Sequence, residues 1–142
     1  MKLYKSDKVR FISGLIIIIL IYSWFYIFFI ENSNLVISKL GKYFVSFATT
    51  IAVYFVGTFH LGKLKDKWMS LLWHVIHVSG LCIATSLGLV DWLITDIGMN
   101  LVSFARSIQE MLISPLLYLA MGLINRVLNK DAVSTTNIQE KQ

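Results

Sequence analysis

The chain has 142 residues, of which 56% are hydrophobic and 15% are charged, and its formal net charge is +5. Soluble domains carry about 25% charged residues, so this composition favours a single membrane-embedded domain over a soluble one. The basic residues are dispersed and are not interleaved with aromatic residues, which argues against binding to nucleic acid. The single cysteine, Cys82, excludes a disulfide within the chain.

Three long blocks contain no Lys, Arg, Asp or Glu, and they cover residues 11–30, 43–62 and 68–90. A hydrocarbon core about 30 Å thick requires about 20 helical residues, because each residue rises about 1.5 Å. We therefore predict transmembrane helices over about 11–30, 43–62 and 68–92. The first block is too long, and too rich in bulky aromatic residues near its end, to be a cleaved signal peptide.

Small and hydroxyl residues lie on one face of the second and third predicted spans. The second span carries Ser46 and Thr50, and the third carries Gly80, Ala84 and Gly88 at intervals of four residues. Small residues at this spacing allow a second helix backbone to approach closely, and hydroxyl groups usually form hydrogen bonds between helices. The sequence leaves open whether the glycine–alanine stripe packs within the chain or forms a contact between subunits.

The three histidines, His60, His74 and His77, all fall near the junction of the second and third spans. His74 and His77 share a helix face, so the three imidazoles are candidate ligands for zinc or haem. Metal-bound histidines normally have carboxylate or carbonyl partners, and the only carboxylate nearby in the sequence is Asp66. We expect structural or interfacial histidines, with metal or haem binding and pH sensing as the alternatives.

Residues 94–112 have a different pattern, with apolar residues at intervals of three and four and polar residues between them. The apolar face consists of Ile94, Ile97, Leu101, Phe104, Ile108 and Met111, and the polar face of Asp96, Asn100, Ser103, Ser107 and Glu110. This pattern predicts an amphipathic helix over about 96–110 that lies on the membrane surface before the last span. A gate or a surface that binds a partner is the alternative interpretation.

The fourth span is predicted over about 111–129, where residues 111–125 are uncharged and Arg126 can extend its charged group to the interface. Pro115 near the start of this span predicts a bend. Its polar stripe consists of Ser114, Tyr118 and Asn125. The tail over 131–142 is polar and unpatterned, and we expect it to be disordered.

The basic residues predict that both termini are cytoplasmic, because Lys and Arg concentrate in cytoplasmic segments. Ten of the 13 Lys and Arg residues fall in the N-terminal segment, in the loop near 63–67 and in the C-terminal segment from Arg126 onward. The other three are Lys39, Lys42 and Arg106. No carboxylate or Arg lies deep in any predicted span, which argues against an ion-coupled transporter.

Motifs of known enzymes are missing from the sequence, which contains no nucleophile elbow, zinc-protease helix, C-x-x-C pair or phosphate-binding loop. Asp91 and Asp96 lie on either side of Trp92 and could form a paired carboxylate site that acts on a lipid substrate. Acidic residues in such loops are usually just solvated, so a membrane enzyme ranks third among the functional hypotheses.

These features predict an all-α integral membrane protein, a four-helix bundle over residues 1–130 with an amphipathic interfacial helix before the last span. The layout is similar to that of small bacterial membrane proteins, including immunity proteins against pore-forming bacteriocins and membrane effectors of antiphage defence. The resemblance implies a bacterial inner-membrane protein. We expect a non-enzymatic protein without a cofactor that associates with itself or with another membrane protein and alters membrane permeability. The alternative is an accessory or redox subunit with haem or metal bound by histidine.

Overall fold

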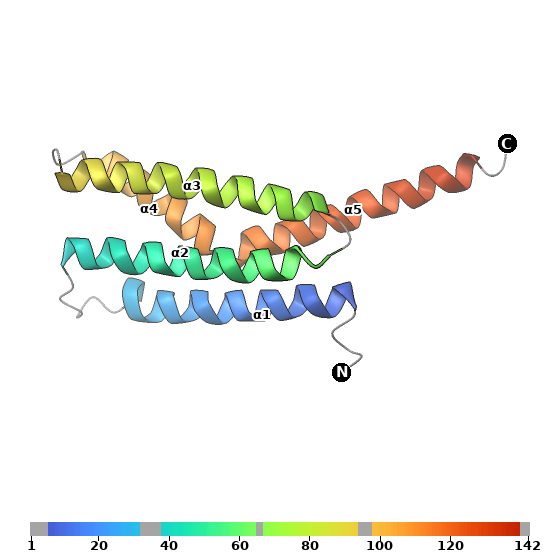
Figure 1. The fold of residues 1–142 in the computed structure, drawn as a ribbon, viewed down its shortest axis with the longest axis horizontal. Coiled ribbons are helices and arrows are strands. Elements are labelled where there is room, and N and C mark those ends of the chain that lie inside the picture. The colour runs from blue at the N-terminus through green and yellow to red at the C-terminus, as the bar shows by residue number, and fades with distance from the viewer. Residues whose placement is uncertain (1–5, 32–37, 65–66, 94–97, 140–142) are drawn as a thin grey trace.

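The computed structural model describes residues 6–31, 38–64, 67–93 and 98–139, and this part of the chain is helical with no strand (Figure 1). Its elements are the α-helix α1 (Asp7–Phe25), the π-helix η2 (Tyr26–Glu31), and the α-helices α2 (Lys39–Leu61), α3 (Lys67–Leu93), α4 (Met99–Ile113) and α5 (Pro115–Gln139). The all-α prediction is therefore confirmed.

Three helical segments are long and apolar enough to cross a membrane, namely Asp7–Glu31, Leu40–Leu61 and Lys67–Leu93. The three charge-free blocks thus form helices that are long and apolar enough to be membrane spans. The pair α4 and α5 also meets the criterion over Met99–Ile113 and Pro115–Val127, although the two helices are bent by 55°. The described chain thus has three candidate spans, or four if the bent pair is one span.

Helices α1, α2 and α3 lie side by side and alternate in direction (Figure 1). α1 packs against α2 and α5, whereas α3 packs against α2 and α4. The start of α1, the turn between α2 and α3, and α5 lie toward the same end of the bundle. At this end a guanidinium nitrogen of Arg10 donates a hydrogen bond to the carbonyl oxygen of Lys63 at 2.7 Å, which ties α1 to the turn.

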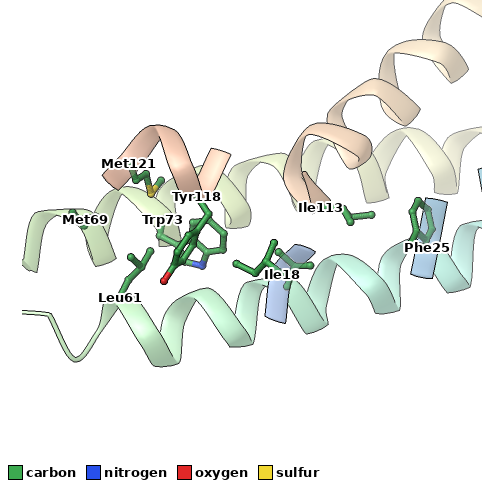
Figure 2. Packing of buried hydrophobic residues seen from close by; sticks show 9 residues of the cluster. Ile18, Phe25, Leu61, Met69, Trp73, Ile113, Tyr118 and Met121 are labelled. Atoms are coloured by element: carbon green, nitrogen blue, oxygen red, sulfur yellow. The ribbon is translucent and has the colours of Figure 1, made fainter. Parts of the chain in front are cut away.

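The core is densest near that end, where the rings of Trp73 on α3 and Tyr118 on α5 meet edge to face with centroids 5.6 Å apart (Figure 2). Glycines make room for both rings. A Cβ atom at Gly57 on α2 would overlap the Trp73 indole, and one at Gly14 on α1 would lie 2.5 Å from the Tyr118 hydroxyl. In hydrocarbon such close packing takes the place of hydrophobic burial as the force that joins helices.

The structure differs from the sequence prediction for the amphipathic helix. α4 packs against α3 and α2 and does not lie apart from the bundle, and Figure 1 shows it passing behind α3. The predicted apolar face points outward, since Leu101, Phe104 and Met111 are 48%, 54% and 52% exposed. The buried face instead carries Ala105, Gln109, Leu112 and Ile113. Periodicity locates an apolar face but does not say whether protein or lipid covers it, and small and polar residues are typical of contacts between helices in membranes.

The end of the chain differs as well. α5 begins at Pro115, one residue after α4 is capped by Ser114, so the bend predicted from the proline is confirmed. The helix then continues to Gln139, through most of the tail that we expected to be disordered. No second proline follows Pro115, so every residue of this segment can donate its backbone N–H to a helical hydrogen bond.

Candidate functional site

The break between α4 and α5 leaves main-chain carbonyl groups without their usual helical donors. Pro115 has no N–H group, so the carbonyl of Met111 loses the donor four residues later. The N–H of Leu116, which would otherwise reach the carbonyl of Leu112, donates to the Ser114 hydroxyl oxygen at 3.2 Å. Ser114, predicted as part of a polar stripe, therefore caps the start of α5, and the Leu112 carbonyl is left for another donor.

His77 on α3 places a ring nitrogen there, because its Nε2 lies 3.2 Å from the carbonyl oxygen of Leu112 and donates to it in the tautomer that carries the proton on Nε2. The side chain is fully buried, and its Nδ1 lies 3.1 Å from the carbonyl oxygen of Trp73 in the preceding turn. The Trp73 ring covers the imidazole, with centroids 3.8 Å apart. A neutral imidazole has a single N–H, so only one of these two carbonyl oxygens can accept a hydrogen bond from it. A proton on Nε2 satisfies the interrupted helix, which gives a reason for a histidine within this apolar segment.

The other two histidines have different neighbours. The Nδ1 of His74 lies 2.8 Å from the Tyr54 hydroxyl, and the Nδ1 of His60 lies 2.8 Å from the carbonyl oxygen of Val56. His60 also packs against Gly14 on α1. No group of three potential metal ligands gathers within residues 6–31, 38–64, 67–93 and 98–139. Each histidine ring thus contacts its own set of polar groups within the bundle.

The small-residue stripe of α3 packs largely within the chain. Gly80 faces the Leu112 side chain of α4, where a Cβ atom would lie 2.8 Å from a methyl group, and Ala84 is buried. Gly88 is more open, since a Cβ atom there would lie 3.9 Å from its nearest neighbour, Tyr43. The first two members of the stripe serve contacts between helices of one copy, and Gly88 borders open space.

Polar side chains of α2 and α4 meet inside the bundle. The Ser46 hydroxyl donates to Oε1 of Gln109 at 2.9 Å, and the Thr50 hydroxyl donates to the carbonyl oxygen of Ser46 at 2.8 Å. Gln109 is 9% exposed and lay outside every stripe that the sequence indicated. Asn125, from the predicted stripe of the fourth span, is partly buried on α5, away from this pair.

Asp91 near the end of α3 is also buried, and the Tyr43 hydroxyl on α2 donates to its Oδ2 at 2.8 Å. This contact joins the start of α2 to the end of α3, as the Arg10–Lys63 bond joins the chain at the opposite end. Asp96, which the sequence offered as a second carboxylate, lies outside the described residues. Asp91 therefore serves as a hydrogen-bond acceptor between two helices.

The polar face of α4 is exposed on the surface of the bundle. Its members Asn100, Ser103, Ser107 and Glu110 are exposed, and so is the neighbouring Arg106. Gln109, one residue before Glu110, bonds to Ser46, which lies seven residues after the start of α2. At a rise of about 1.5 Å per residue, Ser46 and Gln109 therefore lie about 10 Å from the start of α2 along a candidate span. Arg106 and Glu110 are therefore charged residues beside apolar helices, which the sequence prediction had placed outside every span.

A groove of about 500 Å³ separates the start of α2 from the end of α3. Phe44 and Trp92 stand on its exposed walls, Gly88 leaves it wide, and Gln109 reaches it from α4. An apolar groove of about 560 Å³ lies between α1 and α2. The groove between α1 and α2 is not lined by an amide, whereas the groove between α2 and α3 combines apolar walls with the Gln109 side chain.

No protein-family model, curated protein or solved structure matches this chain, so its function has to be argued from its own residues.

Proposed function

We propose that this protein is a non-enzymatic integral membrane protein that assembles with copies of itself so that the polar faces of α4 surround a water-filled path. The exposed stripe of Asn100, Ser103, Ser107 and Glu110, with Arg106 beside it, is the observation that supports this function. The stripe lies on a helix that packs against two candidate membrane spans.

Exposure to lipid would be costly for this stripe. A charged side chain at the centre of a membrane helix costs about 2.5–3.5 kcal/mol on insertion scales, and such residues normally face the bundle interior or a water-filled cavity. Glu110 lies next to Gln109, about 10 Å along a candidate span, whereas Arg106 is about one turn nearer the start of α4. Arg106 and Glu110 face outward in one copy, so a single copy does not cover them. Assembly around a common axis would place them against water and against the same residues of neighbouring copies.

Several copies are required because one bundle of this size has no room for a lumen. The Ser46 hydroxyl bonds to Gln109 of α4, and the Thr50 hydroxyl bonds to the Ser46 carbonyl oxygen within α2. These hydroxyl groups are already occupied inside the bundle, so they are not available to line a path. We therefore assign the lining of the water-filled path to the exposed polar face of α4.

We further propose that both termini are cytoplasmic. The start of α1 and the α2–α3 turn lie at one end of the bundle, and ten of the 13 basic residues belong to the segments expected at that side. In this orientation α4 descends from the outer surface and ends beside His77. α4 has 15 residues, or about 22 Å of helix, and its Leu112 carbonyl meets His77, 16 residues from the end of α3 at Leu93.

The test is ion flux into liposomes that contain the purified full chain, compared with liposomes without protein. We expect the protein to conduct small ions and Glu110→Gln to reduce the preference for cations, because a charge in the path has been removed. Lys42→Gln is the matched control, since it removes an exposed charge near the start of α2 and should leave selectivity unchanged. A strictly monomeric protein in mild detergent, or flux no greater than in empty liposomes, contradicts the proposal.

A further inference from the structure

The groove between α2 and α3 contains an unusual combination of apolar walls and one buried amide. Gln109 reaches it from α4 and is more than nine-tenths buried. Its Oε1 accepts a hydrogen bond from Ser46, whereas the two hydrogens on Nε2 have no partner among the residues that the structure describes. Nε2 is accessible from the groove, and in hydrocarbon no water accepts its hydrogens, so a donor that faces apolar walls favours a ligand that supplies an acceptor.

The walls indicate that this ligand comes from the bilayer. Phe44 and Trp92 are 71% and 56% exposed, so the groove opens sideways to whatever surrounds the helices. For a helix that crosses a membrane, the surroundings are lipid acyl chains. Trp92 lies at the end of the groove on α3 and Tyr43 near its middle on α2, and tryptophan and tyrosine are enriched where hydrocarbon meets the headgroups. The ester carbonyls of glycerophospholipids lie at that boundary.

The shape agrees with one extended chain. The groove follows α2 over the ten residues from Ser38 to Phe47, whose ends are about 13 Å apart along the helix axis. Its volume of about 500 Å³ falls within the range of small-ligand sites. Gly88 keeps it open, because a Cβ atom there would meet only the Tyr43 ring at 3.9 Å. The lysine at position 42, exposed at the same end, suits an anionic headgroup.

We infer that this groove binds one acyl chain of a glycerophospholipid, with the ester carbonyl accepting a hydrogen bond from Nε2 of Gln109. Gln109 lies on the buried side of α4, away from the polar face that carries Ser107. Lipid binding therefore requires neither assembly nor ion conduction, and the failure of either does not affect it.

The test compares two lipids that differ only in the acceptor. The full chain is purified in mild detergent and exposed to equal amounts of a diester phosphatidylglycerol and its diether analogue, which lacks the carbonyls. Native mass spectrometry then counts the lipids retained. We expect a preference for the ester of about threefold to tenfold, which is the effect of one hydrogen bond within a membrane protein.

Three variants separate the amide from the groove. Gln109→Leu should abolish the preference while lipid is still retained, and Ser46→Ala, which leaves the Nε2 donors in place, should keep it. Gly88→Leu fills the groove and should reduce retention of both lipids. Circular dichroism verifies that each variant remains helical.

Equal retention of ester and ether by the unmodified protein overturns the inference, as does unchanged retention by Gly88→Leu. Retention of a quinone in place of phospholipid also overturns it. A protein that retains no lipid, and whose dimer dissociates on Gly88→Leu, would show that a second copy occupies the groove.

Discussion

The imidazole Nε2 of His77 lies 3.2 Å from the carbonyl oxygen of Leu112, and this contact joins α3 to the end of α4. His77→Phe keeps the size of the ring but removes the donor, so the Leu112 carbonyl becomes unsatisfied within the bundle. We expect a loss of about 1–2 kcal/mol in the free energy of unfolding, measured by titration with a denaturing detergent. His74→Phe is the control, because that ring is only partly buried; an equal loss there would contradict a special role for His77.

The bend at Pro115 depends on the missing N–H group. Pro115→Ala restores a donor for the Met111 carbonyl and allows α4 and α5 to form one helix. Spin labels at the exposed positions 103 and 123 would be about 30 Å apart along a straight helix and are closer across a bend of 55°. We expect electron paramagnetic resonance to show a longer distance in the variant. An unchanged distance would mean that contacts with α2 and α3 impose the bend.

The glycines of the bundle have unequal roles. Gly57→Ala places a methyl group against the Trp73 indole and should destabilise the protein by about 1–3 kcal/mol, as overpacking does in other cores. Gly88→Ala adds the same methyl group beside open space, so it should be neutral or stabilising by up to about 1 kcal/mol through helix propensity. Thermal unfolding of the two variants in the same detergent checks the difference, and equal melting temperatures would show that Trp73 adjusts freely.

Tyr43 holds the buried carboxylate of Asp91 at 2.8 Å. Tyr43→Phe removes the hydroxyl and leaves the ring in place, so we expect a loss of about 1–2 kcal/mol in stability. Tyr26→Phe serves as the control because that side chain is 43% exposed. If both variants unfold at the same denaturant concentration, the Tyr43–Asp91 contact does not stabilise the packing of the start of α2 against the end of α3.

The sequence predicted the parts of the fold that depend on local chemistry. Charge-free blocks of about 20 residues located α1, α2 and α3, because the bilayer fixes how long such a block must be. Pro115 located the bend, because a residue without an N–H group interrupts a helix wherever it occurs.

The contacts across the bundle could not be predicted in this way. The contacts Ser46–Gln109 and His77–Leu112 join residues 63 and 35 positions apart. Gln109 shows no signal in the sequence, since a single amide on an amphipathic helix is ordinary. The orientation of α4 was also hidden, because a helix that turns its apolar side to lipid has the same periodicity as one that turns it to a core.

Cross-linking between copies tests the central claim most directly. In a chain with Cys82→Ser and Ser107→Cys, the new thiol lies on the polar face of α4, whereas in Cys82→Ser with Leu20→Cys it lies on α1, where Leu20 is 63% exposed. Both proteins are oxidised in membranes and separated without reductant. The proposed assembly predicts disulfide-linked dimers for position 107 and monomers for position 20. Monomers at position 107, or equal cross-linking at both positions, would contradict it.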